Sequence, residues 1–295
     1  MALAVSPLHA LFAAEASGLD LSLPLEDGAV RDLIAAMDRY AVLVFHGQAL
    51  DQDQQIAFAR RLGPLDLGLG KIRKGRPHRL KYEELADISN VDLAGKVAAR
   101  DSAKILNNLA NQLWHSDSSF QKPPARYSML YAVEVPAKGG ETEFCDLRAA
   151  YDALPPETKE QVADLRSEHF ALHSRIMLGN EDYTEEQKAM MPPVEWPLVR
   201  THPGSGRKLL WVGVHARRIL GMRVPEGRLL LMDLLEHATQ RQFVFQHRWR
   251  DGDLVMWDNR AVLHRGRRFD LSERREMRRS TTEDESESIS TPARV

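Results

Sequence analysis

The sequence predicts a mainly β protein in which helices flank a compact β core. Short apolar runs follow one another at 208–214, 243–247, 254–257 and 261–264, and Gly or Asp-Asn turns separate them. Strand and helix patterns do not alternate in the repeated βαβ manner of parallel sheets. The length of 295 residues also lies within the range of one large domain.

The chain opens with a predicted helix followed by a strand. Apolar residues at helical spacing between 30 and 37 precede an Ala-Val-Leu-Val-Phe run at 41–45, which is typical of a buried strand. Asp51 and Gln54 then match a capping box, so we expect a second helix that ends at Gly-Pro, 63–64.

The next stretch, 65–103, has little sustained periodicity and predicts a long, mobile excursion. Basic residues crowd into its middle: Lys71, Arg73, Lys74, Arg76, Arg79 and Lys81. Solvated charges on a surface loop would give the same pattern.

Further helices are predicted at 147–153, 156–165 and 225–238, the last with Pro at an early position, where its missing N–H costs nothing. We expect one domain over 1–282. The acidic, Ser-rich end at 283–295 contains almost no large apolar groups, which predicts a disordered tail.

Charge and cysteine content exclude several classes of protein. Lys plus Arg total 40 against 42 for Asp plus Glu, so a formal charge of −2 indicates no nucleic-acid partner and no acidic membrane surface. No apolar run approaches the length needed to span a bilayer. The one cysteine, Cys145, suits a reducing compartment. We therefore expect a cytoplasmic protein, and we also expect a homo-oligomer.

Familiar nucleotide and hydrolase motifs are absent from the sequence. It contains no GxxxxGK[ST], no GxGxxG after a strand, no GxSxG and no HExxH. The Gly-Ser-Gly segment at 204–206 lacks P-loop spacing and predicts a hairpin turn.

The candidate metal ligands are His115, Asp117 and His264. Residues two apart in an extended segment point the same way, so His115 and Asp117 can face one ion. His264 follows a short strand-like run and could return beside them. Two His and one carboxylate leave open positions on a metal, as in non-haem Fe(II) oxygenases, while a zinc hydrolase is the chemical competitor.

Arg275 and Arg279 distinguish these readings. If 275–280 is a strand, both guanidiniums lie on one face and can bind carboxylates bidentately. A solvated basic run is the alternative, because several other arginines are close by. A metal site with two carboxylate clamps suits a small-molecule carboxylate substrate and 2-oxoglutarate, which chelates iron at one end and needs a cation at the other.

Longer motifs resemble the taurine dioxygenase family of Fe(II)/2-oxoglutarate-dependent dioxygenases. They are the Trp-His-Ser-Asp segment at 114–117, Gly-Gly-Glu-Thr at 139–142, Trp-Asp-Asn-Arg at 257–260, and the Arg275 and Arg279 pair. Within that family the chain is most similar to members that act on 2,4-dichlorophenoxyacetate, as NQLWHSDSSFQ and DLVMWDNRAVLHRGRR illustrate.

The resemblance implies a double-stranded β-helix (jelly-roll) core with iron held by the triad named above. By position, Thr142 and Arg275 would bind the distal carboxylate of 2-oxoglutarate, and Arg279 would bind the carboxylate of the substrate. Asn111 would polarise the substrate or only cap a turn. Lys71 and Arg79, with Lys81 and Lys96, would belong to a lid over the substrate.

The implied reaction oxidises the substrate while 2-oxoglutarate becomes succinate and CO₂, with Fe(II) and O₂ required and ascorbate supporting activity. Hydroxylation beside the ether oxygen of an aryloxyacetate gives a hemiacetal, which collapses to a phenol and glyoxylate. Alternatives are a sibling dioxygenase acting on a phenoxypropionate, sulfonate or sulfate ester, a zinc-dependent hydrolase, and a non-enzymatic binding module.

Overall fold

The computed structural model describes residues 2–73, 77–180 and 183–288. The strands of these residues are β1 (Ala4–Pro7), β2 (Ala14–Ser17), β3 (Val42–Phe45), β4 (Ala86–Asp87), β5 (Ala125–Glu134), β6 (Thr142–Asp146), β7 (Arg166–His169), β8 (Val194–Pro197), β9 (Val199–Thr201), β10 (Lys208–Leu210), β11 (Ala216–Ile219), β12 (Val244–His247), β13 (Leu254–Asp258), β14 (Val262–Gly266) and β15 (Glu276–Glu283). The helices are α1 (Asp27–Tyr40), α2 (Gln52–Arg60), α3 (Ala103–Asn108), α4 (Leu147–Asp152), α5 (Pro156–Val162), α6 (His173–Ile176), α7 (Glu185–Ala189) and α8 (Val224–Ala238). Short 3₁₀ helices are η1 (Gly68–Arg73), η2 (Leu109–Gln112), η3 (Arg241–Phe243) and η4 (Glu285–Ser288).

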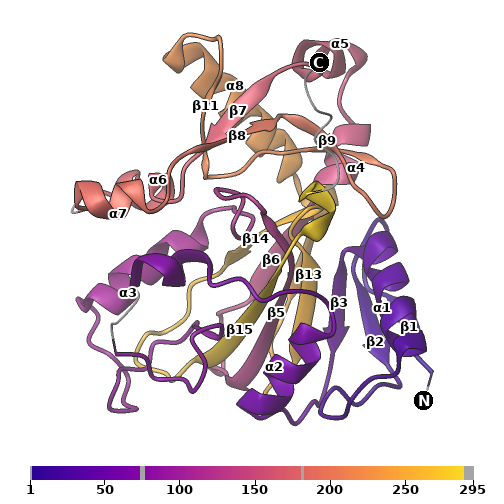
Figure 1. Ribbon diagram of the computed structural model, residues 1–295, viewed down its shortest axis with the longest axis vertical. Helices are drawn as coiled ribbons and strands as arrows, with labels where there is room; N and C mark the ends of the chain where they lie inside the picture. Colours follow the sequence, from indigo (N-terminus) through magenta and orange to yellow (C-terminus); the bar gives the residue numbers. More distant parts are fainter. Residues whose placement is uncertain (1, 74–76, 181–182, 289–295) are drawn as a thin grey trace.

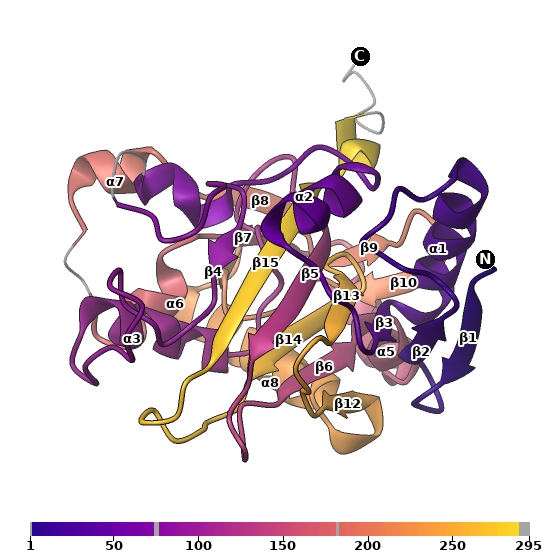
Figure 2. The same cartoon turned by 90° about the horizontal axis from the view of Figure 1, so that it is seen from below.

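The core is a jelly-roll built from two facing sheets. The larger has seven strands in the order β1-β2-β3-β13-β5-β15-β4, and the smaller has the order β12-β6-β14. Apolar residues from both sheets share one buried cluster, including Val255 and Leu130 from the larger sheet and Phe144 and Val262 from the smaller. Figures 1 and 2 show the long strands β5, β13 and β15 side by side, with β6 and β14 behind them.

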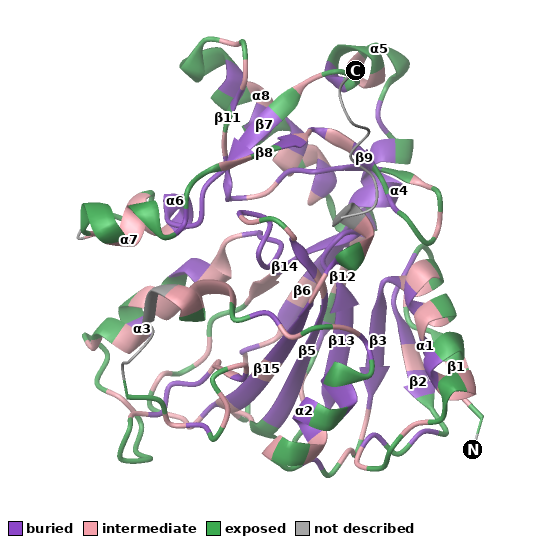
Figure 3. Cartoon of the chain, viewed as in Figure 1, coloured by how far each residue is buried: buried purple, intermediate pink, exposed green. Residues whose placement is uncertain are grey.

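Strand β13 shows why the sequence forms these layers. Val255 and Trp257 enter the cluster between the sheets, whereas Leu254 and Met256 pack on the opposite face. This alternation follows from the two-residue period of a strand. Helices α1 and α2 cover that outer face with apolar residues such as Leu33. Figure 3 shows the central strands buried and the solvent side of the flanking helices exposed.

A second layer of helices covers the smaller sheet. Cys145 and Leu263, the outward residues of β6 and β14, share a cluster with apolar residues of α4 and α8. The short sheets β11-β7-β8 and β10-β9 extend this side of the molecule (Figure 1). The predicted hairpin turn at 204–206 joins β9 to β10.

Most predicted elements are confirmed. The first helix and strand are α1 and β3, and α2 begins with the expected capping box, in which Asp51 and Gln54 bond reciprocally. The three later helices are α4, α5 and α8. The strand-like runs correspond to β10, β12, β13 and β14, and the strand predicted at 275–280 is β15.

Strand β5 is the principal element that the sequence patterns did not indicate. Its ten residues pair with β13 on one side and β15 on the other, so it lies at the centre of the larger sheet. Arg126 and Ser128 interrupt its apolar residues, which obscures the pattern of a central strand. Ser128 is nonetheless fully buried, because it faces the candidate site described below.

The tail prediction is wrong for its first residues. Strand β15 continues to Glu283, and the buried Asp284 carboxylate accepts a hydrogen bond from Arg260 Nη1 at 3.2 Å. A charge pair therefore anchors a segment that composition alone marked as disordered. The remainder of the predicted tail, 289–295, lies outside the described residues.

The predicted excursion at 65–103 is mostly irregular, but it contains η1 and the short strand β4, which pairs with β15 at the edge of the larger sheet. Residues 74–76, with two of the predicted basic side chains, lie outside the described residues. None of the described helices is long and apolar enough to cross a bilayer.

Candidate active site

The predicted metal ligands His115, Asp117 and His264 come together between the two sheets. The segment after η2 lies antiparallel to β14, where His115 N donates to His264 O at 3.0 Å and His264 N donates to His115 O at 2.8 Å. One ligand atom from each of the three side chains lies within 4.8 Å of the others, and all three side chains are buried. A late strand thus returns beside an early segment, as expected.

Neighbouring groups orient these side chains. The His115 ring bonds Leu113 O through Nδ1 at 2.7 Å, so Nδ1 carries the proton and Nε2 is left for a metal. Asp117 Oδ2 accepts from Ser128 Oγ at 2.7 Å, and Asp117 N donates to Asn259 Oδ1 at 3.0 Å. Such outer bonds fix the direction of a coordinating carboxylate.

The electrostatics of the triad fit a divalent metal. Burial lowers the pKa of His115 and lowers that of His264 well below the ordinary value, so both imidazoles are neutral near pH 7. Neutral imidazoles and an ionised carboxylate are the protonation states that metal ligands require. The donor set, two His nitrogens and one carboxylate with open positions, suits Fe(II).

A second cluster with metal-like spacing has a structural role. It contains Asp38, His202 and Asp258. His202 accepts from Ser205 N through Nδ1 and bonds Asp258 Oδ2 through Nε2 at 3.0 Å, while Asp258 also pairs with Arg260. Its ring nitrogens and carboxylate are thus already engaged with protein groups.

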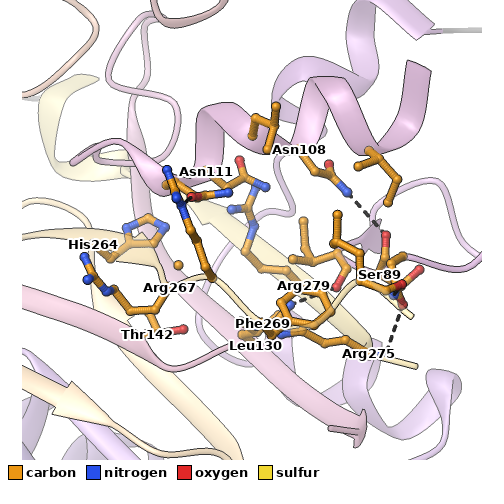
Figure 4. Close-up of a pocket in the computed structure, with 18 of the residues that line it drawn as sticks. Ser89, Asn108, Asn111, Leu130, Thr142, His264, Arg267, Phe269, Arg275 and Arg279 are labelled. Atoms are coloured by element: carbon orange, nitrogen blue, oxygen red, sulfur yellow. Dashed lines mark hydrogen bonds between the residues drawn. The ribbon is translucent and has the colours of Figure 1, made fainter. Parts of the chain in front are cut away.

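A cavity of about 360 Å³ opens beside the triad (Figure 4). His115, His264, Thr142, Arg275 and Arg279 are among the residues that line it. Both predicted carboxylate-binding arginines therefore reach one cavity, because alternate residues of the β15 segment point the same way. Met277, between them, enters the core between the sheets.

Arg275 is the most unusual group in this cavity. Its Nη1 and Nη2 make only long bonds, to Ile88 O at 3.3 Å and Gly140 O at 3.4 Å. Among the described residues, Nε has no hydrogen-bond partner and no carboxylate pairs with the guanidinium. Burial lowers the pKa of Arg275 to about 10. A buried cation without a counter-ion is costly, which indicates that an anionic ligand completes the site.

Gly140 allows the approach of this arginine. It has φ of +71°, and a Cβ there would lie 3.2 Å from Arg275 Nε and 3.3 Å from Pro136 Cγ. A side chain at this position would therefore be both strained and crowded. The Gly-Gly pair before Thr142 thus lets the backbone approach the anion site closely.

Thr142 and Arg279 supply further donors. Thr142 Oγ1 accepts from Trp249 Nε1 at 3.0 Å, which leaves the hydroxyl proton for another acceptor. Arg279 Nη1 donates to Asp117 Oδ1 at 2.6 Å, and its Nε has no hydrogen-bond partner within the described parts of the chain. Arg279 therefore contacts a candidate metal ligand while keeping donor capacity for an anion.

A second cavity, of about 400 Å³, reaches the triad from the side of the excursion. It is lined by Asp117, Arg279, parts of 66–93 and residues of α3. Asn111, at η2, lines both cavities, and its predicted contact with the substrate stays a prediction. The triad thus lies between one space that ends at a buried cation and another whose walls combine charged groups with apolar ones such as Leu69 and Phe120.

His215 is a site residue that the sequence patterns did not single out. It lies just before β11 in the second cavity, with its ring 4.8 Å from Phe120 and 6.3 Å from His115. Burial lowers its pKa well below the ordinary value, and its Nδ1 has no partner among the described groups. The end of the predicted strand at 208–214 is the only sequence signal near it.

The predicted lid cations bind other protein groups. Arg79 donates to both oxygens of Asp87 at 3.0 Å and also pairs with Glu276. Lys71 donates to Gln121 Oε1 at 3.0 Å, and it lines neither cavity. Arg79 nevertheless lines the second cavity, and the predicted substrate contacts of both residues stay predictions.

Comparison with known proteins yields one family and several close relatives. The model of the taurine catabolism dioxygenase TauD, TfdA family matches residues 4–281. The alpha-ketoglutarate-dependent 2,4-dichlorophenoxyacetate dioxygenase of Cupriavidus pinatubonensis is 61% identical over 97% of this chain and 99% of that protein. The (S)-phenoxypropionate/alpha-ketoglutarate-dioxygenase of Sphingobium herbicidovorans is 38% identical, covering 92% of each chain. The crystal structure of AAD-2 in complex with Mn(II) and N-oxalylglycine superposes with a TM-score of 0.92 at 51% identity, covering 96% of this chain and 98% of AAD-2.

Proposed function

The chain belongs to the taurine catabolism dioxygenase TauD, TfdA family, and from that premise we propose that it is an Fe(II)- and 2-oxoglutarate-dependent dioxygenase of aryloxyacetates such as 2,4-dichlorophenoxyacetate. The observation that carries the cosubstrate is Arg275, a buried guanidinium without a carboxylate partner among the described residues, in a cavity that also reaches His115 and His264. The observation that carries the substrate is the 61% identity to a 2,4-dichlorophenoxyacetate dioxygenase over nearly the whole chain.

The three buried ligands His115, Asp117 and His264 would hold the iron on one face. Bound iron supplies the activation of O₂, with electrons from the oxidative decarboxylation of 2-oxoglutarate to succinate and CO₂. Arg275 and the Thr142 hydroxyl bind the distal carboxylate of 2-oxoglutarate. The protein thereby fixes the cosubstrate at the end remote from the metal, which sets its orientation.

Arg279 would hold the carboxylate of the substrate. It lines both cavities, so a carboxylate bound there leaves the rest of an aryloxyacetate to extend into the second cavity, past the ring of Phe120. The methylene group between the carboxylate and the ether oxygen is then kept near the metal ligands. One oxygen atom of O₂ enters the C–H bond of that methylene, and the resulting hemiacetal breaks into a phenol and glyoxylate.

Arg279→Ala tests this assignment. We expect kcat/KM for 2,4-dichlorophenoxyacetate to fall by a factor that corresponds to roughly 2–5 kcal/mol of lost binding free energy, the contribution of one charged contact. KM for 2-oxoglutarate should change little. Arg279→Lys should recover only part, because an ammonium lacks the planar fork. Phenol release and succinate formation are measured in parallel. Because Arg279 also contacts Asp117, Mn(II) affinity is measured for each variant to separate substrate binding from metal binding.

A substrate panel distinguishes the alternatives. Purified enzyme with Fe(II), ascorbate and 2-oxoglutarate is given 2,4-dichlorophenoxyacetate, each enantiomer of a phenoxypropionate, taurine and an alkyl sulfate. Brisk succinate formation with a sulfur compound and no phenol from 2,4-dichlorophenoxyacetate would overturn the substrate but keep the reaction. A zinc hydrolase would act without O₂ and without 2-oxoglutarate, and it would have no use for the unpaired Arg275.

A cytoplasmic location and a homo-oligomeric state remain part of the proposal. The single cysteine, Cys145, is a buried free thiol whose pKa is raised by burial, and it needs no oxidising compartment. Sedimentation of the purified protein tests the oligomeric state, and a purely monomeric species would contradict it.

A further inference from the structure

Thr142 is bonded to a residue that does not itself line the cosubstrate cavity. Trp249 Nε1 donates to Thr142 Oγ1 at 3.0 Å. Strand β12 pairs with β6 so that His247 lies opposite Thr142, and Trp249 follows two residues later, beyond the end of the strand. Thr142 lines the cavity, whereas Trp249 is absent from the described lining of both cavities.

We propose that Trp249 is a positioning residue that fixes the Thr142 hydroxyl as a donor toward the distal carboxylate of 2-oxoglutarate. An indole N–H can only donate, so it occupies a lone pair of the threonine oxygen. The hydroxyl proton must then point away from Trp249. A carboxylate only accepts, and a hydroxyl already turned to donate suits it better than a freely rotating one. The inference rests on the proposed role of Thr142.

A buried network holds Trp249 in place. The His247 ring lies edge-on to the indole, with the ring centroids 4.6 Å apart at 89°. His247 Nε2 bonds Asp253 Oδ2 at 3.0 Å, and Arg250 N donates to the same oxygen at 2.9 Å. The other Asp253 oxygen bonds His46 Nδ1, just after β3, at 2.6 Å. The turn that carries Trp249 is thus tied to the larger sheet.

This anchoring distinguishes positioning from packing. Trp249 is only half-buried and packs at the edge of the cluster between the sheets, where a phenylalanine could supply most of the apolar contact. What phenylalanine lacks is the N–H. Trp249→Phe therefore removes the bond to Thr142 with little change in shape, and Trp249→His returns a ring N–H.

The test is a double-mutant cycle read by binding. 2-Oxoglutarate is titrated calorimetrically into Mn(II)-loaded wild type, Trp249→Phe, Thr142→Val and the double variant. We expect Trp249→Phe to weaken binding about three- to tenfold, the effect of one neutral hydrogen bond. In the Thr142→Val background it should have no further effect. Trp249→His should recover part of the loss. In turnover, KM for 2-oxoglutarate should rise while kcat and KM for the aryloxyacetate stay unchanged.

Arg248→Ala is the matched control, because Arg248 is exposed on the same turn and should leave 2-oxoglutarate binding unchanged. If Thr142→Val binds 2-oxoglutarate normally, the proposed role of Thr142 fails. If Thr142→Val weakens binding while Trp249→Phe does not, or if the two losses add, Trp249 is not the positioning residue. Thermal unfolding of each variant identifies any that lose affinity only because they unfold. If Trp249→Phe is such a variant, 2-oxoglutarate binding by Trp249→His is compared with that of the wild type instead.

Discussion

At the scale of single residues, the site is defined by polar groups whose partners are incomplete. Among the described residues, Arg275 is buried without a carboxylate partner and His215 is buried with no partner for its Nδ1. Two other buried arginines are paired with carboxylates, Arg148 with Asp146 and Arg260 with Asp258. Because folding penalises an unsatisfied buried group, such groups persist where a ligand satisfies them.

The metal ligands give the first residue-scale prediction. His115→Ala, Asp117→Ala and His264→Ala should each lose nearly all turnover and Mn(II) affinity, because each removes one of three ligands. Ser128→Ala, which keeps the three ligands but removes the bond to Asp117 Oδ2 together with those to Thr281 Oγ1 and Asn259 Nδ2, should weaken Mn(II) binding by roughly 10–100-fold. Calorimetry measures the metal, and circular dichroism verifies the fold. Normal Mn(II) affinity in an alanine variant would exclude that residue from the ligand set.

At the scale of elements, β15 links the chemistry to the excursion at 65–103. Arg275 directly precedes this strand and Arg279 lies within it, while its edge pairs with β4 of the excursion. Asp87, in β4, binds Arg79 and Lys104. The excursion is therefore fastened at β4, and its remaining residues form one wall of the second cavity.

A proteolysis experiment tests this element. We expect cleavage within 65–103 in the free protein and protection when metal, 2-oxoglutarate and 2,4-dichlorophenoxyacetate are added without O₂. Asp87→Asn should speed cleavage of the free protein, because it weakens the contacts to Arg79 and Lys104. Asp53→Asn, which loosens the exposed pair with Lys81, is the control and should have a smaller effect. Equal cleavage with and without ligands would argue for an ordinary surface loop.

The pH dependence of the contacts that hold β4 in place follows from the pKa of Asp87. Burial raises its pKa, but the bonds from Arg79 and Lys104 outweigh burial and lower the pKa below its ordinary 3.8. A carboxyl whose pKa is lowered on folding contributes stability that is present above the unfolded pKa and lost as pH falls through the folded one. The Asp87 contacts should therefore be unaffected between pH 6 and 8.

At the scale of the whole molecule, the residues after β15 connect segments of the larger sheet that are distant in sequence. Strand β15 is paired along its length with β5, and Asp284 then meets Arg260, which follows β13. Asp284 N also donates to Pro124 O at 2.8 Å. The last described residues thus tie together the segments on both sides of β5.

Asp284→Ala tests this connection. The substitution leaves part of the buried Arg260 guanidinium unpaired. We therefore expect the free energy of unfolding to fall by roughly 1–3 kcal/mol and Tm to fall by several degrees. Asp270→Ala is the matched control, because Asp270 is exposed and accepts from Ser272 just as Asp284 accepts from Ser286. Differential scanning calorimetry compares the two variants. Equal shifts would mean that only the local turn, and not the contact with Arg260, contributes to stability.

The sequence by itself determined the local elements and the chemistry of the site. Helical periodicity predicted α1 and α8, and a capping box predicted α2, because these signals depend on residues close in sequence. Side-chain type and spacing likewise predicted the triad and the pair of arginines. The long motifs at 114–117 and 139–142 predicted the family.

Only the tertiary structure decided which polar residues lack partners. Arg79 and Arg275 look alike in sequence, but Asp87 and Glu276 pair with the first, while the second is buried without a carboxylate among the described residues. The central position of β5, the bond between Trp249 and Thr142, and the burial of His215 also depend on groups that are distant in the chain. A pairing between such groups is a property of the packed sheets, and a local pattern cannot carry it.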